Sequence, residues 1–551
     1  MGSPDMTFTV TTGPWETLSA DALVIPVWKT VEPAQKPDAK AKSGKKSTDS
    51  ASAFQLPRAL GALDKALQGM ISATAAEEKF SGACGATLTF RKTPGDRLPA
   101  RRVTLVGLGE VDKLTLGKLE SAVIKAINPH LELKNLETLA IGAPDLTAAS
   151  KSLPFNADQA LMQLVDAAFS ATYRSEEAKE PGPAPQNVSL VLTSAPKASD
   201  RQALAEGIAL AKARSRVKDL VNRPSNLKST QTLVDEALAL GKRPGVTVAI
   251  ESDPAWIERE MPCFFEVARG SLVSDPPRWI RVSYRPGAAQ IKGKGKEKAN
   301  AEVVKTAGGD PPQLALVGKS VIFDTGGYQV KPGNGMCTMK GDMTGGASVL
   351  AAIGALADLQ APVTVTAYLP ATPNKIDSGA MIPDAIVSTS CGKKVEIRHT
   401  DAEGRLTLID AVTLAAREKP TRMVTIATLT GSASQAVGMR MALMTNDAAN
   451  SSGFGDQVAR AAAAVGDPVQ RLIVDESDFD DIKSKLDGAD IRNTQKTTGR
   501  GAQTAAAFVM SGAPDGLPLA HFDIAGADMT PDEKATGIGV KTLVRLALDL
   551  A

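Results

Sequence analysis

The 551-residue chain has few of the side chains that most often hold metals or act as nucleophiles, with only three His and four Cys. None of the histidines, at positions 130, 399 and 521, begins the H-E-x-x-H pattern of a zinc-binding helix. The cysteines, at positions 84, 263, 337 and 391, are too far apart in the sequence for a C-x-x-C metal knuckle or redox pair. Four cysteines in so long a chain also argue against a disulfide scaffold. We therefore expect any chemistry to depend on carboxylates, lysines and arginines.

Long apolar runs and a charge excess are missing as well. No uncharged apolar run approaches the roughly 18–20 residues that a bilayer span requires, so we expect no membrane-spanning helix. Lys plus Arg number 63 and Asp plus Glu number 61, and the formal net charge of +2 gives no bulk electrostatic argument for nucleic acid binding. The polar start of the sequence has no basic segment followed by an apolar core. Together with the few cysteines, this predicts a cytoplasmic protein.

The pattern of short apolar runs predicts an α/β protein of two domains. In the N-terminal part, β-rich runs near residues 21–27, 85–91, 102–108 and 188–193 alternate with helix-like stretches near 59–72 and 157–171. This alternation is typical of an α/β domain with a largely parallel sheet. We place a smaller N-terminal α/β domain at residues 1–185, a linker helix region at 186–222 and a larger C-terminal catalytic domain at 223–551.

A lysine-rich stretch interrupts the N-terminal domain at residues 36–52. Because it has almost no apolar residues, we predict a disordered surface insertion. The alternative is a tail that binds nucleic acid or a partner. This alternative is weakened because the stretch lacks aromatic residues that could stack on bases. A second lysine-glycine insertion is expected at residues 292–299.

The first cluster of chemically informative residues spans 314–347. A strand-like run at 314–323 contains Lys319, and Asp324 follows at its end. A helix is expected at 343–359, directly after Asp342. Strand ends and helix starts are where open α/β sheets bind ligands. The tripeptide at 318–320, G-K-S, does not make a nucleotide P-loop, because position 313 is Gln where that motif needs Gly.

The second cluster spans 394–406 and is expected to run from a strand through a turn into a helix that reaches Ala416. Asp401 and Glu403 are two residues apart, so in extended geometry both carboxylates point to the same side, and Arg405 follows by the same step. Taken singly, these residues favour the simpler interpretation, in which the two acids are ordinary helix N-terminal residues and Arg405 is their surface partner.

Considered together, the acids of the two clusters favour a metal site. Asp324, Asp342, Asp401 and Glu403 lie at loop or element ends inside apolar surroundings, where gathered like charges are costly unless cations neutralise them. Two divalent cations would balance four carboxylates, and oxygen ligands favour Mg²⁺, Mn²⁺, Co²⁺ or Zn²⁺. Cationic side chains in the same segments, Lys319, Lys331 and Arg405, would suit an oxyanionic transition state.

These segments resemble the signatures of the leucyl aminopeptidase family, peptidase family M17 or cytosol aminopeptidases. The family hallmark N-T-D-A-E-G-R-L stands at residues 399–406 as H-T-D-A-E-G-R-L. The earlier family block G-K-G-x-x-F-D-[ST]-G-G-x-x-x-K, with an Asp eleven residues later, matches 318–331 and Asp342 except that Ser320 replaces the second Gly. The similarity extends over about residues 205–551.

The resemblance implies a role for each matching residue. Asp324 and Glu403 would bridge two metal ions, Lys319 and Asp342 would complete the tighter site, and Asp401 would complete the more exchangeable one. As a ligand, Lys319 must be a neutral amine, with a pKa well below about 10.4. Lys331 would stabilise the gem-diolate, and a bicarbonate held by Arg405 would act as general base. The first-residue pocket and substrate backbone would be contacted by Met339, Thr428, Leu429, Thr430 and Gly431. For Met339, plain core packing is an equal alternative.

A few positions depart from the family pattern or need separate interpretation. His399 replaces the usual Asn, and is either a partner of the ligand two residues away on the same strand face or a simple structural substitution. Cys337 occupies a place often held by Asp and could be a thiol near the metals, which we do not favour. We interpret His521 and Asp523 as a buried structural hydrogen-bonded pair.

The resemblance therefore implies a metal-dependent aminopeptidase that hydrolyses N-terminal, preferentially leucine-like residues from peptides through a two-metal-activated water. The expected cofactors are two divalent ions per subunit, Zn²⁺ and/or Mn²⁺ with Co²⁺ or Mg²⁺ as alternatives, and bicarbonate. It also implies a C-terminal domain with a mixed central sheet flanked by helices, and a homohexamer arranged as a dimer of trimers. We expect peptides with a free N-terminus as partners, and neither membrane nor nucleic acid. The rival hypotheses are a non-catalytic hexameric binding or regulatory protein, and a two-metal phosphoesterase.

Overall fold

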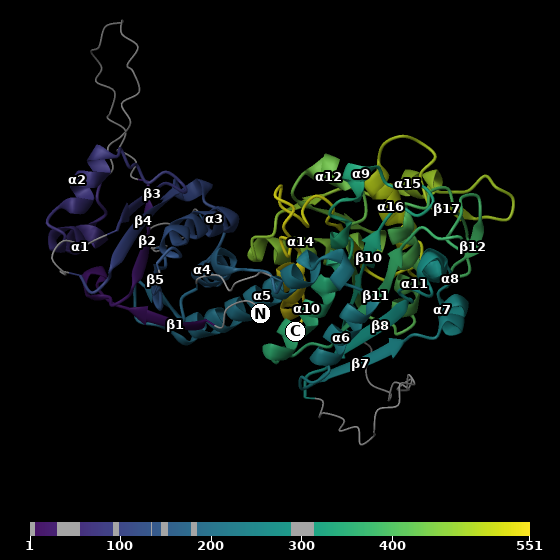
Figure 1. Ribbon diagram of the computed structural model, residues 1–551, viewed down its shortest axis with the longest axis horizontal. Helices are drawn as coiled ribbons and strands as arrows, with labels where there is room; N and C mark the ends of the chain where they lie inside the picture. The colour runs from purple at the N-terminus through teal and green to yellow at the C-terminus, as the bar shows by residue number, and fades with distance from the viewer. Residues whose placement is uncertain are drawn as a thin grey trace, which may run out of the picture. The chain divides into compact units, whose positions relative to one another are not determined.

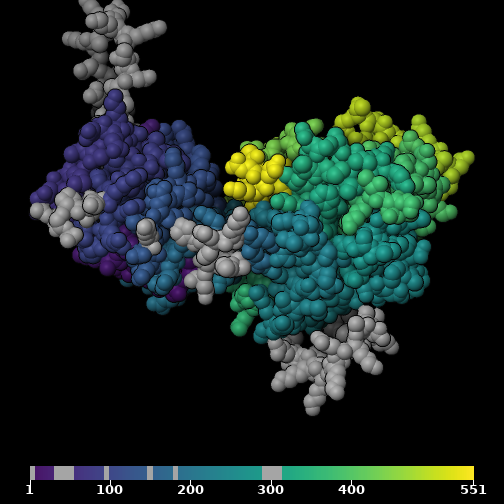
Figure 2. All heavy atoms as spheres, viewed as in Figure 1, coloured from purple at the N-terminus to yellow at the C-terminus, as the bar shows by residue number. Residues whose placement is uncertain are grey.

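The chain forms two compact units in the computed structural model, which describes residues 6–29, 55–91, 98–133, 135–144, 153–177, 184–287 and 313–551. One unit comprises Met1–Arg174 with Ala178–Ala211, and the other comprises Ser175–Glu177 with Lys212–Ala551. In Figure 1 the first is purple to blue and the second runs from teal to yellow, and the atoms of each pack into a compact body (Figure 2). The boundary falls inside one helix, α5 (Ala198–Asn222). The division at residues 185 and 222 stays a prediction, and the insertions predicted at 36–52 and 292–299 lie outside the described residues.

The N-terminal unit contains a six-stranded sheet that is parallel except for β3, which pairs antiparallel with β4. Its order is β1 (Thr7–Thr12), β6 (Asn187–Leu192), β5 (Thr138–Gly142), β2 (Ala22–Trp28), β4 (Arg102–Gly109) and β3 (Thr87–Phe90). Strand β2 reads ALVIPVW and is buried along most of its length, as expected for a parallel strand covered on both faces. The predicted α/β domain with a largely parallel sheet is thus confirmed.

Among the described residues, the α-helices that lie wholly within this unit are α1 (Gly61–Ala66), α2 (Met70–Glu77), α3 (Leu116–Ile127) and α4 (Ala157–Thr172). The helix-like stretch predicted near 59–72 is helical, but it forms parts of two helices, because the chain breaks between α1 and α2. Gln68 and Gly69 both adopt left-handed backbone conformations, with φ of 57° and 78°, which end a helix. A glycine takes this conformation without steric cost, so the helix breaks at the position where the sequence has Gly69.

The C-terminal unit is built on a nine-stranded mixed sheet with helices against it, which confirms the predicted architecture (Figure 1). Along the sheet the order is β16 (Val469–Arg471), β15 (Met441–Thr445), β18 (Leu519–Asp523), β14 (Arg422–Ala427), β9 (Leu314–Gly318), β11 (Val365–Asn374), β8 (Arg278–Tyr284) and β7 (Val246–Glu251), with β10 (Ser320–Asp324) paired to β11. The central strands β18, β14, β9 and β11 run parallel, whereas β15 and β8 pair with them antiparallel.

Helices pack on this sheet in two groups. Helix α10 (Thr344–Asp358) contacts α17 (Val540–Asp549) and α6 (Thr230–Leu240), and α11 (Glu403–Ala416) contacts α8 (Pro262–Ala268) and α16 (Gly501–Met510). The remaining helices are α7 (Pro254–Glu260), α9 (Gly333–Met336), α12 (Gly431–Val437), α13 (Asp447–Ser451), α14 (Phe454–Ala464) and α15 (Glu476–Asp481). No helix in the described ranges has both the length and the apolar character needed to span a membrane.

A small three-stranded sheet in the C-terminal unit has the strand order β12 (Ile386–Ser388), β13 (Lys394–Glu396) and β17 (Ile491–Arg492). Strand β13 pairs antiparallel with β12 and parallel with β17. The loop at 397–402, between β13 and α11, carries part of the second predicted cluster. This small sheet therefore positions that loop.

Candidate metal centre

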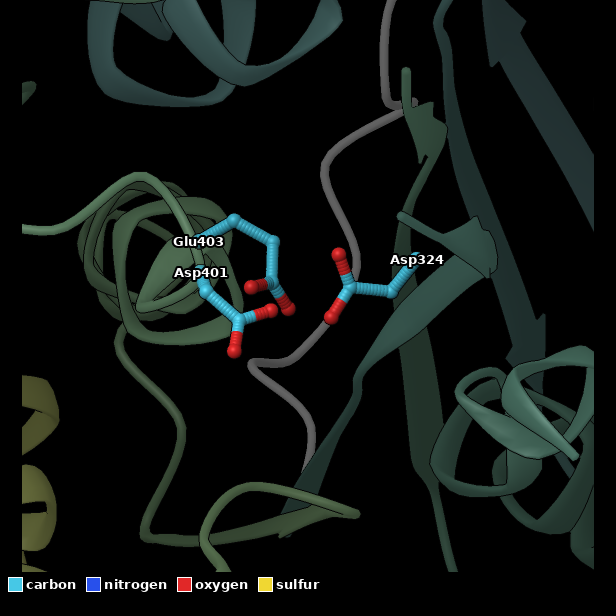
Figure 3. Close-up of side chains that lie close together, drawn as sticks. All are labelled: Asp324, Asp401 and Glu403. Atoms are coloured by element: carbon cyan, nitrogen blue, oxygen red, sulfur yellow. The ribbon is translucent and has the colours of Figure 1, made fainter. Parts of the chain in front are cut away.

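Three carboxylates from the two predicted clusters converge in the C-terminal unit. Asp324 ends β10, Asp401 lies in the loop before α11 and Glu403 begins α11. One oxygen from each carboxylate lies within 4.8 Å of the others, and Figure 3 shows all three groups pointing toward one another. Three like charges this close repel strongly unless cations lie among them. The cluster thus has the donor chemistry of a divalent metal site.

The extended geometry expected at 401–403 is wrong. Strand β13 ends at Glu396, and the chain turns through residues 397–402 before Glu403 starts the helix. The carboxylates of Asp401 and Glu403 still converge, because the turn and the first helical residue bring both side chains to the same end of α11 (Figure 3). The predicted strand at 314–323 is also interrupted, because Lys319 separates β9 from β10.

The fourth acid, Asp342, is connected to the cluster through Lys319. The Lys319 Nζ lies 2.7 Å from Asp342 Oδ1 and 2.8 Å from Glu403 Oε1, and it donates to the Thr428 carbonyl at 2.9 Å. We call these three charged residues, Lys319, Asp342 and Glu403, the inner group. Their side chains are 2–4% exposed. Gly404 permits this packing, since a Cβ there would lie 2.7 Å from the Lys319 Nζ.

A second lysine joins the remaining carboxylates. The Lys331 Nζ lies 2.8 Å from Asp324 Oδ2 and 2.5 Å from Asp401 Oδ1. We call Lys331, Asp324 and Asp401 the outer group, in which the Lys331 side chain is 16% and the Asp401 side chain 26% exposed. The chain reaches Lys331 through a turn at Gly326, whose φ is 87° and where a Cβ would lie 2.6 Å from the Gln329 carbonyl oxygen.

The ionisable side chains of the inner and outer groups shift one another's pKa values. Burial lowers the pKa of Lys319, but Asp342, Glu403 and Asp324 act in the opposite direction and the net pKa is raised. Burial raises the pKa of Asp342 and Glu403. Burial and the neighbouring acids raise the pKa of Asp401 to about 7. Without metal, the two lysine ammonium groups offset only part of the charge of the four carboxylates. A metal bound by Lys319 would have to displace its proton.

Arg405 lies in the first turn of α11 and is 6% exposed. Its Nε and Nη1 have no hydrogen-bond partner among the described residues. Burial lowers its pKa to about 10, although Glu403 and Asp523 counteract this. A buried guanidinium with free donors fits a small planar anion such as bicarbonate.

The predicted substrate residues Thr428, Leu429, Thr430 and Gly431 follow β14 and lead into α12. Thr428 borders the inner group, because its hydroxyl donates to Asp342 Oδ1 at 2.8 Å. Asp523 holds the next residues by accepting from the Leu429 N–H at 3.0 Å and the Thr430 hydroxyl at 2.7 Å. Met339 lies half-buried in the turn before Asp342, where both predicted roles stay open.

Other sequence-based expectations need correction. His399 lies in the 397–402 loop rather than on a strand, and its Nδ1 accepts from the Asp401 backbone N–H at 3.2 Å. His521 and Asp523 are buried but do not bond to each other, since His521 Nδ1 pairs with the Thr425 hydroxyl at 2.6 Å and Asp523 accepts from Leu429 and Thr430. Cys337 is exposed and is not part of the carboxylate cluster.

The sequence reasoning missed Asn374, which contacts the centre directly. It ends β11 and is buried, and its Nδ2 donates to Asp324 Oδ1 at 2.8 Å and to the Thr400 carbonyl at 3.1 Å. It thereby connects the outer group to the 397–402 loop. The available signal was a polar residue at the end of a long apolar run, beside the strand that carries Asp324.

Comparison with known proteins gives consistent matches over most of the chain. The catalytic domain of the cytosol aminopeptidase family matches residues 215–544, and the N-terminal domain of that family matches residues 42–181. A probable cytosol aminopeptidase from Syntrophotalea carbinolica is 32% identical over 504 residues, covering 88% of this chain and 92% of the relative. One from Nostoc punctiforme is 33% identical over 512 residues, covering 90% and 94%.

Two solved structures are similar over nearly the full length. A tomato leucine aminopeptidase mutant has a TM-score of 0.79 and 25% identity, covering 100% of this chain and 97% of that one. The bottromycin maturation enzyme BotP in complex with Mn has a TM-score of 0.73 and 25% identity, covering 97% and 100%.

Proposed function

Since this chain belongs to the cytosol aminopeptidase family and is an aminopeptidase, we propose that it removes N-terminal residues, preferentially leucine-like ones, with two divalent metal ions. The observation that carries this proposal is the convergence of Asp324, Asp401 and Glu403 within 4.8 Å. Such a group is electrostatically unfavourable without cations and gives a two-metal hydrolase its ligands.

The residues of the centre suit two ions. Asp324 and Glu403 would lie between them, Lys319 and Asp342 would complete the tighter site, and Asp401 the more exchangeable one. The buried Asp342 Oδ2 has no hydrogen-bond partner in the described part of the chain, which supports a ligand role. Oxygen donors with one amine suit Zn²⁺ or Mn²⁺, with Co²⁺ or Mg²⁺ as alternatives. Bound metals would lower the pKa of water and polarise the scissile carbonyl.

Besides the metal ions, the side chains of Lys331 and Arg405 would act as cations in catalysis. With metal ions present, Asp324 and Asp401 can bind them, and the ammonium of Lys331 is released to donate to the substrate carbonyl oxygen as negative charge develops there. Arg405, with two free donors beside the inner group, would hold a bicarbonate that accepts the proton of the attacking water. No histidine is required in either role.

The substrate would lie along the segment from Thr428 to Gly431, with Met339 at the pocket for the first side chain. Asp523 fixes the backbone of Leu429 and the hydroxyl of Thr430, so this wall is rigid where a peptide would bind. A peptide in this position would place its free α-amine at the ions held by the carboxylates and Lys319, and cleavage would then be restricted to its first residue.

We also propose, from the family, a homohexamer arranged as a dimer of trimers that acts in the cytoplasm. Sedimentation velocity of the purified protein tests this assembly. A monomer at assay concentration would contradict the hexamer without affecting the proposed chemistry.

Hydrolysis of leucine anilide before and after complete metal removal, with Mn²⁺, Zn²⁺, Co²⁺ and Mg²⁺ returned singly, tests the proposed function. We expect activity to disappear with the chelator and to return with at least Mn²⁺ or Zn²⁺. Full activity in metal-free protein would contradict the mechanism. A panel of other aminoacyl anilides measures the leucine preference, and a phosphate ester tests the rival hydrolase chemistry.

A further inference from the structure

Asn493 directly follows β17 and is fully buried, at 0% exposed. The parallel pairing of β17 with β13 aligns Glu396 with Arg492, and the Asn493 N–H donates to the Glu396 carbonyl at 3.1 Å. This register brings the Asn493 side chain beside the 397–402 loop, which continues from β13. A residue nearly a hundred positions away in the sequence thus lies against the loop that carries Asp401.

The side-chain amide of Asn493 binds four backbone groups of that loop. Its Oδ1 accepts from the N–H groups of Arg398 at 2.7 Å and His399 at 3.2 Å. Its Nδ2 donates to the carbonyls of His399 at 2.7 Å and Ala402 at 3.4 Å. Buried backbone groups need such partners, and residues 397–402 belong to no strand that could supply them. One side chain therefore binds the backbone on both sides of Asp401.

The same loop is also bound to the segment that follows Asp324. The Thr400 N–H donates to Gln329 Oε1 at 2.6 Å, and the Thr400 hydroxyl donates to the Gly326 carbonyl at 2.6 Å. These bonds connect the loop to the residues that follow Asp324. Asn493 binds other backbone groups of the same loop, so two separate segments of the chain hold it.

We propose that Asn493 is a positioning residue for the outer group, holding the 397–402 loop so that Asp401 stays within metal-sharing distance of Asp324 and Glu403. It acts through the backbone and touches neither metal nor substrate. This inference rests on the proposed function. Loss of its bonds would weaken the outer metal site before the inner one, because Glu403 is also held by α11 and by Lys319.

A matched control exists in the same unit. Asn446 also binds the backbone through its amide: Oδ1 accepts from the N–H groups of Ala449 at 2.9 Å and Leu519 at 3.0 Å, and Nδ2 donates to the Leu517 carbonyl at 2.9 Å. Leu519 begins β18, at the opposite end of that strand from Asp523. Asn446→Ala therefore removes a comparable set of bonds without touching the 397–402 loop.

The test compares full-length wild type, Asn493→Ala, Asn493→Asp and Asn446→Ala by three readouts. These are hydrogen exchange of the metal-free proteins over residues 397–403, equilibrium dialysis against Mn²⁺, and kinetics on leucine anilide. We expect Asn493→Ala to exchange faster at Arg398 and His399, and to bind its weaker Mn²⁺ about 10-fold less tightly, with the tighter ion changed far less. Excess Mn²⁺ should restore most of kcat. Asn493→Asp keeps the acceptor but loses both donated bonds, so an intermediate effect is expected.

Unchanged exchange at 397–403 or unchanged Mn²⁺ binding in Asn493→Ala would overturn the proposal, as would an equal loss of Mn²⁺ affinity in Asn446→Ala. If Asn493→Ala does not fold, Asn493→Asp decides by the same criteria. A wild-type protein that binds no Mn²⁺ would overturn the proposed function together with this inference. Two ions bound equally well by wild type and variant would overturn this inference alone.

Discussion

The inner and outer groups of the candidate metal centre have the same composition, one lysine bound to two carboxylates, in different surroundings. The inner side chains are 2–4% exposed, and Glu403 stands on a regular helix. In the outer group Asp401 is 26% exposed and lies on a loop that side chains from other segments hold. Ligand rigidity and solvent exclusion both strengthen metal binding, so this difference supports a tight inner and an exchangeable outer ion.

The largest effect is expected from Glu403→Gln, because Glu403 contacts Lys319 in the inner group and converges with the acids of the outer group. The change removes a charge needed by both proposed metals, and kcat/KM on leucine anilide should fall by about 10³-fold or more. Glu418→Gln, which alters an acid paired with Arg281 beyond the other end of α11, is the control and should keep its activity. A Glu403→Gln variant with near-normal kinetics would remove Glu403 from the centre.

Arg405→Ala should lower kcat by about 10²-fold or more while both metals stay bound, because the variant loses the proposed bicarbonate site and no carboxylate. Steady-state kinetics and metal analysis of the same sample check this. Arg417→Ala, near the exposed end of α11, should have little effect. Loss of metal in Arg405→Ala would show that this arginine supports the ligands instead.

A pair of variants, Asp401→Asn and Asp342→Asn, separates the two groups. Asp401→Asn should weaken the exchangeable ion by about 10-fold to 100-fold, and added metal should recover much of the activity. Asp342→Asn should weaken the binding of the tighter ion, and the same metal concentration should not restore the activity. Metal titrations of activity measure both. Identical titrations would mean that the difference in exposure has no consequence for binding.

The smallest effect is expected at Cys337, which is exposed and separate from the carboxylate cluster. Cys337→Ser should change kcat/KM by less than about twofold, as is usual for exposed positions without specific contacts. Inactivation of the wild type by a thiol reagent, with Cys337→Ser protected, would instead place this thiol close to the substrate.

The comparison of the two groups also separates what sequence could predict from what it could not. The apolar runs predicted the sheets, and motif spacing identified the acids and lysines that now lie within bonding distance of one another. The extended geometry expected at Asp401 and Glu403 was wrong, because local alternation does not distinguish a turn from an extended strand. The alternative position at a helix N-terminus is correct for Glu403. Asn374 and Asn493 were missed for a different reason. Asn374 bonds to Asp324 of the outer group and Asn493 bonds to the backbone of the 397–402 loop, and only tertiary structure brings these distant segments together.

Equilibrium dialysis of the wild-type protein and of Asp401→Asn against Mn²⁺, followed by metal analysis, tests the two-metal centre most directly. Two ions per chain in two affinity classes, with the weaker class lost in Asp401→Asn and the tighter one retained, is the predicted result. Binding of no ion, or of a single class that Asp401→Asn leaves unchanged, would contradict it.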